Sequence, residues 1–203
     1  MNHDPSNRRA LCATCQRALR SCLCRWVTPT INRVPVLVLQ HPLEQGHAKG
    51  SLPLLRLSLA QCKADIAEVF SAEQQARWQQ PGTCLLYPHD GTSTQQPEPA
   101  IAEVRQLVLL DGTWRKTRKL LHLNPALQLL PRCTLPALAA LPPSRYAIRK
   151  AQQPDQRSTL EAACLGLGAL EQRPAHYAPL LQAFSNWVDA QASLQPTAFC
   201  RTR

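Results

Sequence analysis

The chain has 203 residues, 44% of them apolar, and a formal net charge of +10. This length allows one well-buried domain with a small appendage, and the apolar fraction argues against a largely disordered chain. Lys and Arg release counterions when they neutralise phosphates, so the charge suits a polyanionic partner, although a merely soluble basic surface explains composition alone equally well. The polar first ten residues and the absence of a membrane-length apolar run favour a cytoplasmic protein.

Residues 1–28 form the first predicted unit, a segment rich in Arg and Cys with little apolar periodicity. Two close pairs of thiolates supply the tetrahedral sulfur shell that Zn²⁺ prefers, and metal binding can fold a segment that has no core of its own. We therefore predict a structural Zn²⁺ site, the alternative being a set of free or redox-active cysteines. Its ligands are Cys12, Cys15, Cys22 and Cys24. Packing is the favoured interpretation of the singly scattered cysteines Cys62, Cys84, Cys133, Cys164 and Cys200.

Residues 29–195 form the second predicted unit, in which short apolar runs alternate with helical patterns. The strand-length runs are 34–39, 66–70, 83–87, 106–110 and 146–148. The helical patterns are 51–61, 98–103, 113–122, 158–171 and 176–191, while 126–130 is ambiguous between a strand and a helix end. Ser158 and Glu161 predict a capping box. The alternation predicts an α/β fold with a mostly parallel sheet flanked by helices.

Polar residues follow several of these strands. They are Gln40, His41 and Glu44 after the first run, His89 and Asp90 after the third, Asp111 after the fourth, and Arg149 and Lys150 after the fifth. The carboxyl ends of parallel strands share one edge of a sheet, and ligands bind beyond that edge. We expect these side chains to line the candidate site.

Six blocks along the chain resemble the DTW-domain family. They are the two cysteine pairs, His41-Pro42-x-Glu44, Leu86-Tyr87-Pro88, Asp111-Gly112-Thr113-Trp114, Tyr146-x-Ile148-Arg149-Lys150, and Ser158-Thr159-Leu160-Glu161-Ala162. The fourth block matches the Asp-x-Thr-Trp signature, and the resemblance covers nearly the whole chain, from Cys12 to about Trp187. One departure is Gly50-Ser51, where family members tend to carry an Asn-Thr pair. Any role of that amide is therefore open here.

The resemblance implies a tRNA-uridine aminocarboxypropyltransferase, which moves the 3-amino-3-carboxypropyl group of S-adenosylmethionine to N3 of a uridine. It also implies a SPOUT-like fold, related to a superfamily of knotted RNA methyltransferases. The implied partners are tRNA and S-adenosylmethionine, with no membrane and no stable protein partner. Two alternatives remain: a SPOUT-type methyltransferase using the same donor, and a non-catalytic zinc-dependent RNA-binding module.

Transfer to N3 requires an aligned donor, loss of the N3 proton and a base that leaves its stack. Asp111 is the candidate base or uridine-orienting group, and its alternative role is an Asp-Gly turn that caps the next helix. Trp114 either stacks on a base or packs in the core beside Leu121. Together with Thr113, these residues form the predicted catalytic set.

The predicted donor-binding residues lie at strand ends and at one helix start. They are Leu86, Tyr87, Pro88, Leu110, Gly112, Arg149, Ser158, Thr159 and Leu160. The free N–H groups and dipole at the start of the 158–171 helix suit an anion, although plain capping explains the same residues.

A basic stripe lies on the helix that follows the signature. Residues at its i, i+3, i+4 and i+7 positions carry the same sign and repel one another, a penalty that RNA phosphates would offset. The alternative is a solvated helix face. The predicted RNA-binding residues are Arg115, Arg118, Lys119 and His122, together with Lys150.

Overall fold

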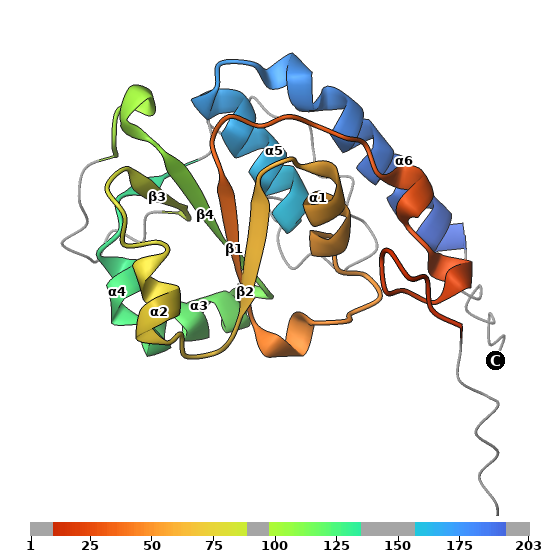
Figure 1. The fold of residues 1–203 in the computed structure, drawn as a ribbon, viewed down its shortest axis with the longest axis horizontal. Helices are drawn as coiled ribbons and strands as arrows, with labels where there is room; N and C mark the ends of the chain where they lie inside the picture. The colour runs from red at the N-terminus through yellow and green to blue at the C-terminus, as the bar shows by residue number, and fades with distance from the viewer. Residues whose placement is uncertain (1–9, 89–97, 135–156, 194–203) are drawn as a thin grey trace, which may run out of the picture.

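The computed structural model describes residues 10–88, 98–134 and 157–193, and these residues form a sheet whose five strands are all parallel (Figure 1). The strands are β1 (Val36–Gln40), β2 (Cys62–Ile66), β3 (Thr83–Leu86), β4 (Gln106–Asp111) and β5 (Arg132–Cys133). Their spatial order is β2-β1-β4-β3-β5. The predicted α/β class with a parallel sheet is confirmed. The predicted strand 146–148 lies outside the described residues, and a knot stays a prediction.

Helices cover both faces of this sheet (Figure 1). One face carries α1 (Leu52–Ser58), α5 (Thr159–Leu170) and α6 (Ala178–Ser193). The other face carries α3 (Trp114–Leu123) and α4 (Pro125–Gln128), with α2 (Ala72–Ala76) beside them. Alternate strand residues point to opposite faces, so Val36 and Val38 enter the first core while Leu37 and Leu39 enter the second. Burial on both faces explains why β1 is apolar over four consecutive residues.

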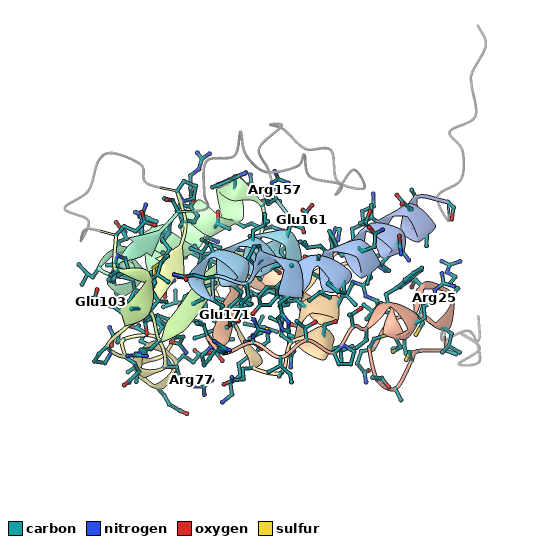
Figure 2. All side chains as sticks on the ribbon, turned by 90° about the horizontal axis from the view of Figure 1, so that it is seen from above. Arg25, Arg77, Glu103, Arg157, Glu161 and Glu171 are labelled. Carbon is teal, nitrogen blue, oxygen red and sulfur yellow. A yellow bond between two sulfur atoms is a disulfide. The ribbon has the colours of Figure 1, made fainter. Side chains whose placement is uncertain are left out.

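Short 3-10 turns complete the description of the elements. They are η2 (Leu19–Ser21), η3 (Cys24–Trp26), η4 (Pro42–Glu44), η5 (Ile101–Glu103) and η7 (Pro174–Tyr177). The predicted capping box of α5 is present, because the Ser158 hydroxyl accepts from Glu161 N at 3.2 Å and Glu161 Oε2 accepts from Ser158 N at 2.9 Å. The start of α5, with Glu161 labelled, is visible in Figure 2.

The chain leaves β1 and β4 toward opposite faces. The two strands are paired neighbours, yet α1 follows β1 on one face and α3 follows β4 on the other. In open α/β sheets such a divergence marks the topological switch point, where ligands bind beyond the carboxyl ends of the strands. The fold therefore singles out the ends of β1 and β4.

Several predicted boundaries are wrong. The second strand is Cys62–Ile66 rather than 66–70, because the apolar run continues beyond the sheet to Phe70, whose ring packs edge-on against Trp78 at 5.1 Å in the second core. The ambiguous run 126–130 belongs mainly to α4, and 98–103 yields only the turn η5. Helix α2 and strand β5 were missed, although Ser71 and Gln74 form a capping box that announces α2.

The Cys-rich segment packs against the main domain instead of standing apart. Cys15 and Leu23 are 6% and 0% exposed and belong to the same core as Trp187 of α6. Both views place the segment beside α6, with Arg25 labelled in Figure 2. None of the helices in the described ranges has the length and apolar character needed to span a bilayer.

A disulfide joins Cys84 of β3 to Cys133 of β5. The interpretation of these two cysteines as singly packed thiols is therefore wrong. Their separation of 49 positions hid the pairing, because the two-residue strand β5 that brings them together has no sequence pattern of its own. Cys62 and Cys164 are unpaired, and Cys164 is buried on α5 as predicted; Cys200 lies outside the described residues.

We predict that peptide mapping of the unreduced protein recovers Cys84 and Cys133 in one cross-linked peptide. In the oxidised protein, Cys133→Ser should lower the free energy of unfolding by about 2–4 kcal/mol, because the bond restricts the unfolded chain. Cys164, buried but unpaired, is the internal control and should be alkylated once the chain unfolds without reductant. Full alkylation of Cys84 and Cys133 under that condition would contradict the pairing.

Candidate functional site

Asp111 lies at the switch point, as the last residue of β4, and is 7% exposed. The parallel register places it opposite Gln40, the last residue of β1. Gln40 Nε2 donates to Asp111 Oδ2 at 2.7 Å, and Thr159 Oγ1 donates to Asp111 Oδ1. Side chains of β1 and α5 therefore hold this carboxylate, so a local Asp-Gly turn does not account for its contacts.

The start of α5 reaches the same edge of the sheet. Leu160 N donates to the hydroxyl of Ser51 at 3.3 Å, and Glu161 N donates to Ser158 Oγ at 3.2 Å. Side chains thus satisfy two of the N–H groups that were predicted to attract an anion. The capping alternative is confirmed at this helix start, and the contact of Thr159 with Asp111 is the feature that bears on the site.

Trp114, the first residue of α3, is 37% exposed and does not belong to the core. Its ring meets Tyr87 edge-on with 5.6 Å between ring centres. The Tyr87 hydroxyl lies 3.4 Å from the hydroxyl of Thr117, which fixes the ring against α3. Core packing was the wrong alternative for Trp114, and its exposed surface can stack on a flat ligand.

A buried arginine supports this aromatic pair. Arg132 of β5 is 1% exposed, its Cζ lies 5.4 Å from the centre of the Tyr87 ring, and its Nη1 donates to the carbonyl of Pro88 at 2.8 Å. No sequence pattern indicated this role, because Arg132 lies in strand β5, which was not predicted.

His41 and Glu44 connect the end of β1 to α3. His41 N donates to the carbonyl of Asp111 at 3.0 Å, and His41 Nε2 lies 2.8 Å from Glu68 Oε1. Glu68 Oε2 also pairs with Lys119 Nζ at 2.7 Å, and this contact is the largest cause that lowers the pKa of Glu68. The buried Glu44 pairs with Lys116 at 2.8 Å. Through these contacts His41 and Glu44, both buried, support the edge of the sheet that carries Asp111.

The basic stripe of α3 is exposed at all four predicted positions. Lys119 is tied to Glu68, and its side chain is 50% exposed. Arg115, Arg118 and His122 extend the same exposed face. The stripe is therefore a cationic surface that begins at the signature, with one of its members engaged by an acidic neighbour.

The remaining predicted residues differ in character. Leu86 packs on α5, where its Cδ2 would lie 3.1 Å from a Cβ added to Gly166, and Leu110 packs against the second core. A Cβ on Gly112 would come within 3.0 Å of Lys116 Cβ, so the turn after β4 has little room for a side chain. Pro88 and Thr113 are exposed. His89, Asp90, Arg149 and Lys150 lie outside the described residues.

The four predicted metal ligands converge. Their Sγ atoms all lie within 4.8 Å of one another, with 3.6 Å between Cys12 and Cys24 and 3.8 Å between Cys15 and Cys22. A tetrahedral Zn²⁺ with bonds of about 2.3 Å needs sulfurs about 3.8 Å apart, so this cluster can hold such an ion. Backbone N–H groups of Cys15 and Thr14 lower the pKa of the Cys12 thiol to about 6, whereas burial raises the pKa of the Cys24 thiol to about 12. The spacing of the four sulfurs, and not their acidity, therefore indicates the metal site.

Comparisons with known proteins agree with the resemblance. The DTW domain matches residues 9–192. A fruit fly protein (Drosophila melanogaster) named tRNA-uridine aminocarboxypropyltransferase 2 is 32% identical over 184 residues, which cover 84% of this chain and 70% of that protein. A macaque protein (Macaca fascicularis) of the same name is 30% identical over 182 residues, which cover 83% of this chain and 59% of that protein. No solved structure matches.

We predict that the purified protein binds about one Zn²⁺ per chain, as a closed four-cysteine shell does. Cys15→Ser should remove most of the bound metal and expose the 10–28 segment to protease, because the ion joins the two cysteine pairs of a segment that has no α-helix or β-strand of its own. Cys62→Ser is the matched control, since this half-buried thiol lies outside the cluster. Metal content below about half an equivalent in freshly purified wild type would contradict the site.

We also predict that Gln40→Glu is more harmful than Gln40→Leu. The glutamate variant places a second carboxylate where the amide now donates to Asp111 at 2.7 Å, so two like charges meet in a buried position. The leucine variant removes one hydrogen bond without adding charge. At neutral pH the unfolding temperature should be highest for the wild type, lower for Gln40→Leu and lowest for Gln40→Glu. Equal unfolding temperatures for the two variants would show that Gln40 does not contact the carboxylate.

Proposed function

The chain belongs to the DTW-domain family, and from this premise we propose that it is a tRNA-uridine aminocarboxypropyltransferase that uses S-adenosylmethionine as the group donor. Two relatives that are 32% and 30% identical to this chain carry that name. The observation that carries the proposal is the placement of Asp111 at the switch point between β1 and β4, held by Gln40 and Thr159.

The proposed reaction is one in-line substitution. The lone pair of uridine N3 forms a bond to the donor methylene next to the sulfonium, and the N3 proton leaves. The carbon–sulfur bond breaks, its electron pair goes to sulfur, and 5′-methylthioadenosine departs as a neutral product. Alignment of the two reactants is the main task of the protein, because a held geometry removes much of the entropic barrier.

Asp111 orients the uridine and takes up its proton in this proposal. Gln40 and Thr159 each donate to one oxygen of the carboxylate. A carboxylate oxygen has more than one lone pair, and the N3–H of a flipped uridine is a donor that a carboxylate accepts. The two neighbouring side chains keep the carboxylate from rotating, so the acceptor is oriented before the base arrives.

The aromatic and basic residues supply binding in this proposal. Trp114 stacks on a base or on the adenine of the donor, braced by Tyr87. Thr113, Gly112 and Pro88 complete the donor side near the strand ends. Ser158, Thr159 and Leu160 fix the start of α5, Leu86 and Leu110 pack beneath the strand ends, and Arg149 remains a proposed carboxylate ligand.

The RNA phosphates lie over α3 in this proposal. Arg115 and Arg118 offer an exposed positive face, and Lys119 adds to it while paired with Glu68. His122 extends this face with an exposed imidazole. Lys150 remains a proposed RNA contact. Phosphate contacts of this kind position the substrate without reading its sequence.

The metal of the four-cysteine cluster is Zn²⁺ in this proposal, and its task is structural. Four thiolates leave no open coordination position, so the ion holds the segment and takes no part in transfer.

We propose the division into a 1–28 metal segment and a 29–195 catalytic domain. A cytoplasmic location also stays a prediction, and the Cys84–Cys133 disulfide bears against it, since such bonds are rare in the cytosol.

We predict that Asp111→Ala lowers transfer by roughly 10²- to 10⁴-fold while S-adenosylmethionine still binds. Nucleoside mass spectrometry of tRNA incubated with the enzyme and the donor measures transfer, and calorimetry measures donor binding. Asp65→Ala is the matched control, because Asp65 is also buried near a strand end but pairs with Arg77 at 2.7 Å. It should keep transfer activity at some loss of stability.

Three outcomes would contradict the proposal in different ways. Full transfer by Asp111→Ala would remove this residue from the reaction. A methyl group on the product nucleoside would assign the protein to the methyltransferases that use the same donor. Absence of donor binding by the wild type would favour a passive RNA-binding module.

A further inference from the structure

The turn that carries the first cysteine pair also fixes an arginine. Cys12 N donates to the carbonyl of Arg17 at 2.7 Å, which closes the turn around Cys15. Gln16 within this turn has a φ of 58°, in the left-handed region of the backbone that residues other than glycine rarely adopt. A metal bound by Cys12 and Cys15 would therefore hold the backbone of Arg17 in place.

The Arg17 side chain leaves the segment and reaches the loop before α1. Its guanidinium donates to the carbonyl of Ala48 and, at 2.5 Å, to the carbonyl of Gly50. Its Cζ lies 5.2 Å from the ring centre of Trp187, a fully buried residue of α6. Arg17 therefore bridges α6 and the loop, with a charged donor on each of two carbonyl oxygens.

The loop continues to the catalytic edge in two contacts. Ser51 follows Gly50 directly, is 3% exposed, and accepts a hydrogen bond from Leu160 N at 3.3 Å. Thr159, the residue before Leu160, donates to the carboxylate of Asp111. A continuous line of contacts therefore runs from the metal segment to Asp111.

Residues 45–50 form an irregular loop. Within residues 45–50, the hydrogen bonds of the main chain are local, such as His47 N to Glu44 O at 3.1 Å and Gly50 N to His47 O at 2.8 Å. No helix or strand runs through this stretch, and its first four residues are exposed. The guanidinium adds a long-range contact that ties this loop to the metal segment and to α6.

We propose that Arg17 is a positioning residue that couples metal binding at the four cysteines to the placement of Ser51, Thr159 and Asp111. The metal segment then acts as a brace for the site rather than a separate appendage. The coupling between segment and loop is independent of the proposed function. Only its consequence for donor binding rests on that function.

Hydrogen exchange with mass spectrometry on the full chain tests this coupling directly. The proteins compared are metal-loaded wild type, chelated wild type, Arg17→Ala and Arg20→Ala. Arg20 is the matched control, because it lies in the same segment but is exposed. Metal content is measured on each sample before exchange.

In metal-loaded Arg17→Ala we expect exchange over 45–52 to be faster by on the order of tenfold, because both charged hydrogen bonds are lost. Chelated wild type should show the same change, and Arg20→Ala should match the loaded wild type. Peptides from α3, on the opposite face, should be unchanged in every sample. Arg17→Lys, which keeps the charge but loses the forked donor, should lie between wild type and Arg17→Ala.

Wild-type exchange over 45–52 in a metal-loaded Arg17→Ala protein would overturn the proposal, as would equal changes in Arg20→Ala. If Arg17→Ala loses its metal, exchange over 45–52 is compared between metal-loaded wild type and metal-loaded Arg17→Lys. Equal exchange in these two proteins would likewise overturn the proposal. Calorimetry separates this from the function: weaker S-adenosylmethionine binding in Arg17→Ala alone supports the coupling to the site. No binding by any protein, wild type included, would instead refute the proposed donor and leave the exchange result standing.

Discussion

The parallel pairing of β1 with β4 is the constraint on which the site depends. Its register runs from Val36 opposite Leu107 to Gln40 opposite Asp111, so two apolar strands end together on a polar pair. A buried carboxylate is costly without hydrogen-bond donors, and Gln40 and Thr159 supply them. Since α1 and α3 leave this point toward opposite faces, the same pairing that secures the core also places Asp111 where α/β sheets bind ligands.

The charges of the molecule are sorted around this point. Acidic groups near the strand ends are tied to bases in the structure, as in the His41–Glu68–Lys119 set and the Glu44–Lys116 pair. Arg115, Arg118 and His122 are exposed on α3. Part of the chain's net charge of +10 is therefore presented to solvent on α3, beside the site, as the proposed polyanionic substrate requires.

The layers of the fold were predictable from the sequence, because β1 and β4 are apolar runs bounded by polar residues and α5 opens on a capping box. The cysteine spacing likewise predicted a cluster that the structure brings together. Contacts set by tertiary packing were not predictable. Strand β5 is too short to have a recognisable pattern, so its disulfide and the buried Arg132 were missed. The second strand was predicted too late in the chain, because the apolar run that ends at Phe70 belongs to the packing against Trp78 and not to the sheet. Gln40 contacts Asp111 because of the β1–β4 register, and Thr159 contacts it because of how α5 packs on the sheet. Neither arrangement is encoded by a local sequence pattern.

The most direct test of the central claim is a crystal structure of the protein with S-adenosylmethionine bound. The account predicts donor density beyond the carboxyl ends of β1 and β4, with its reactive methylene facing Asp111 and its adenine near Tyr87 or Trp114. Density at another edge of the sheet, with Asp111 sealed from the donor, would contradict it.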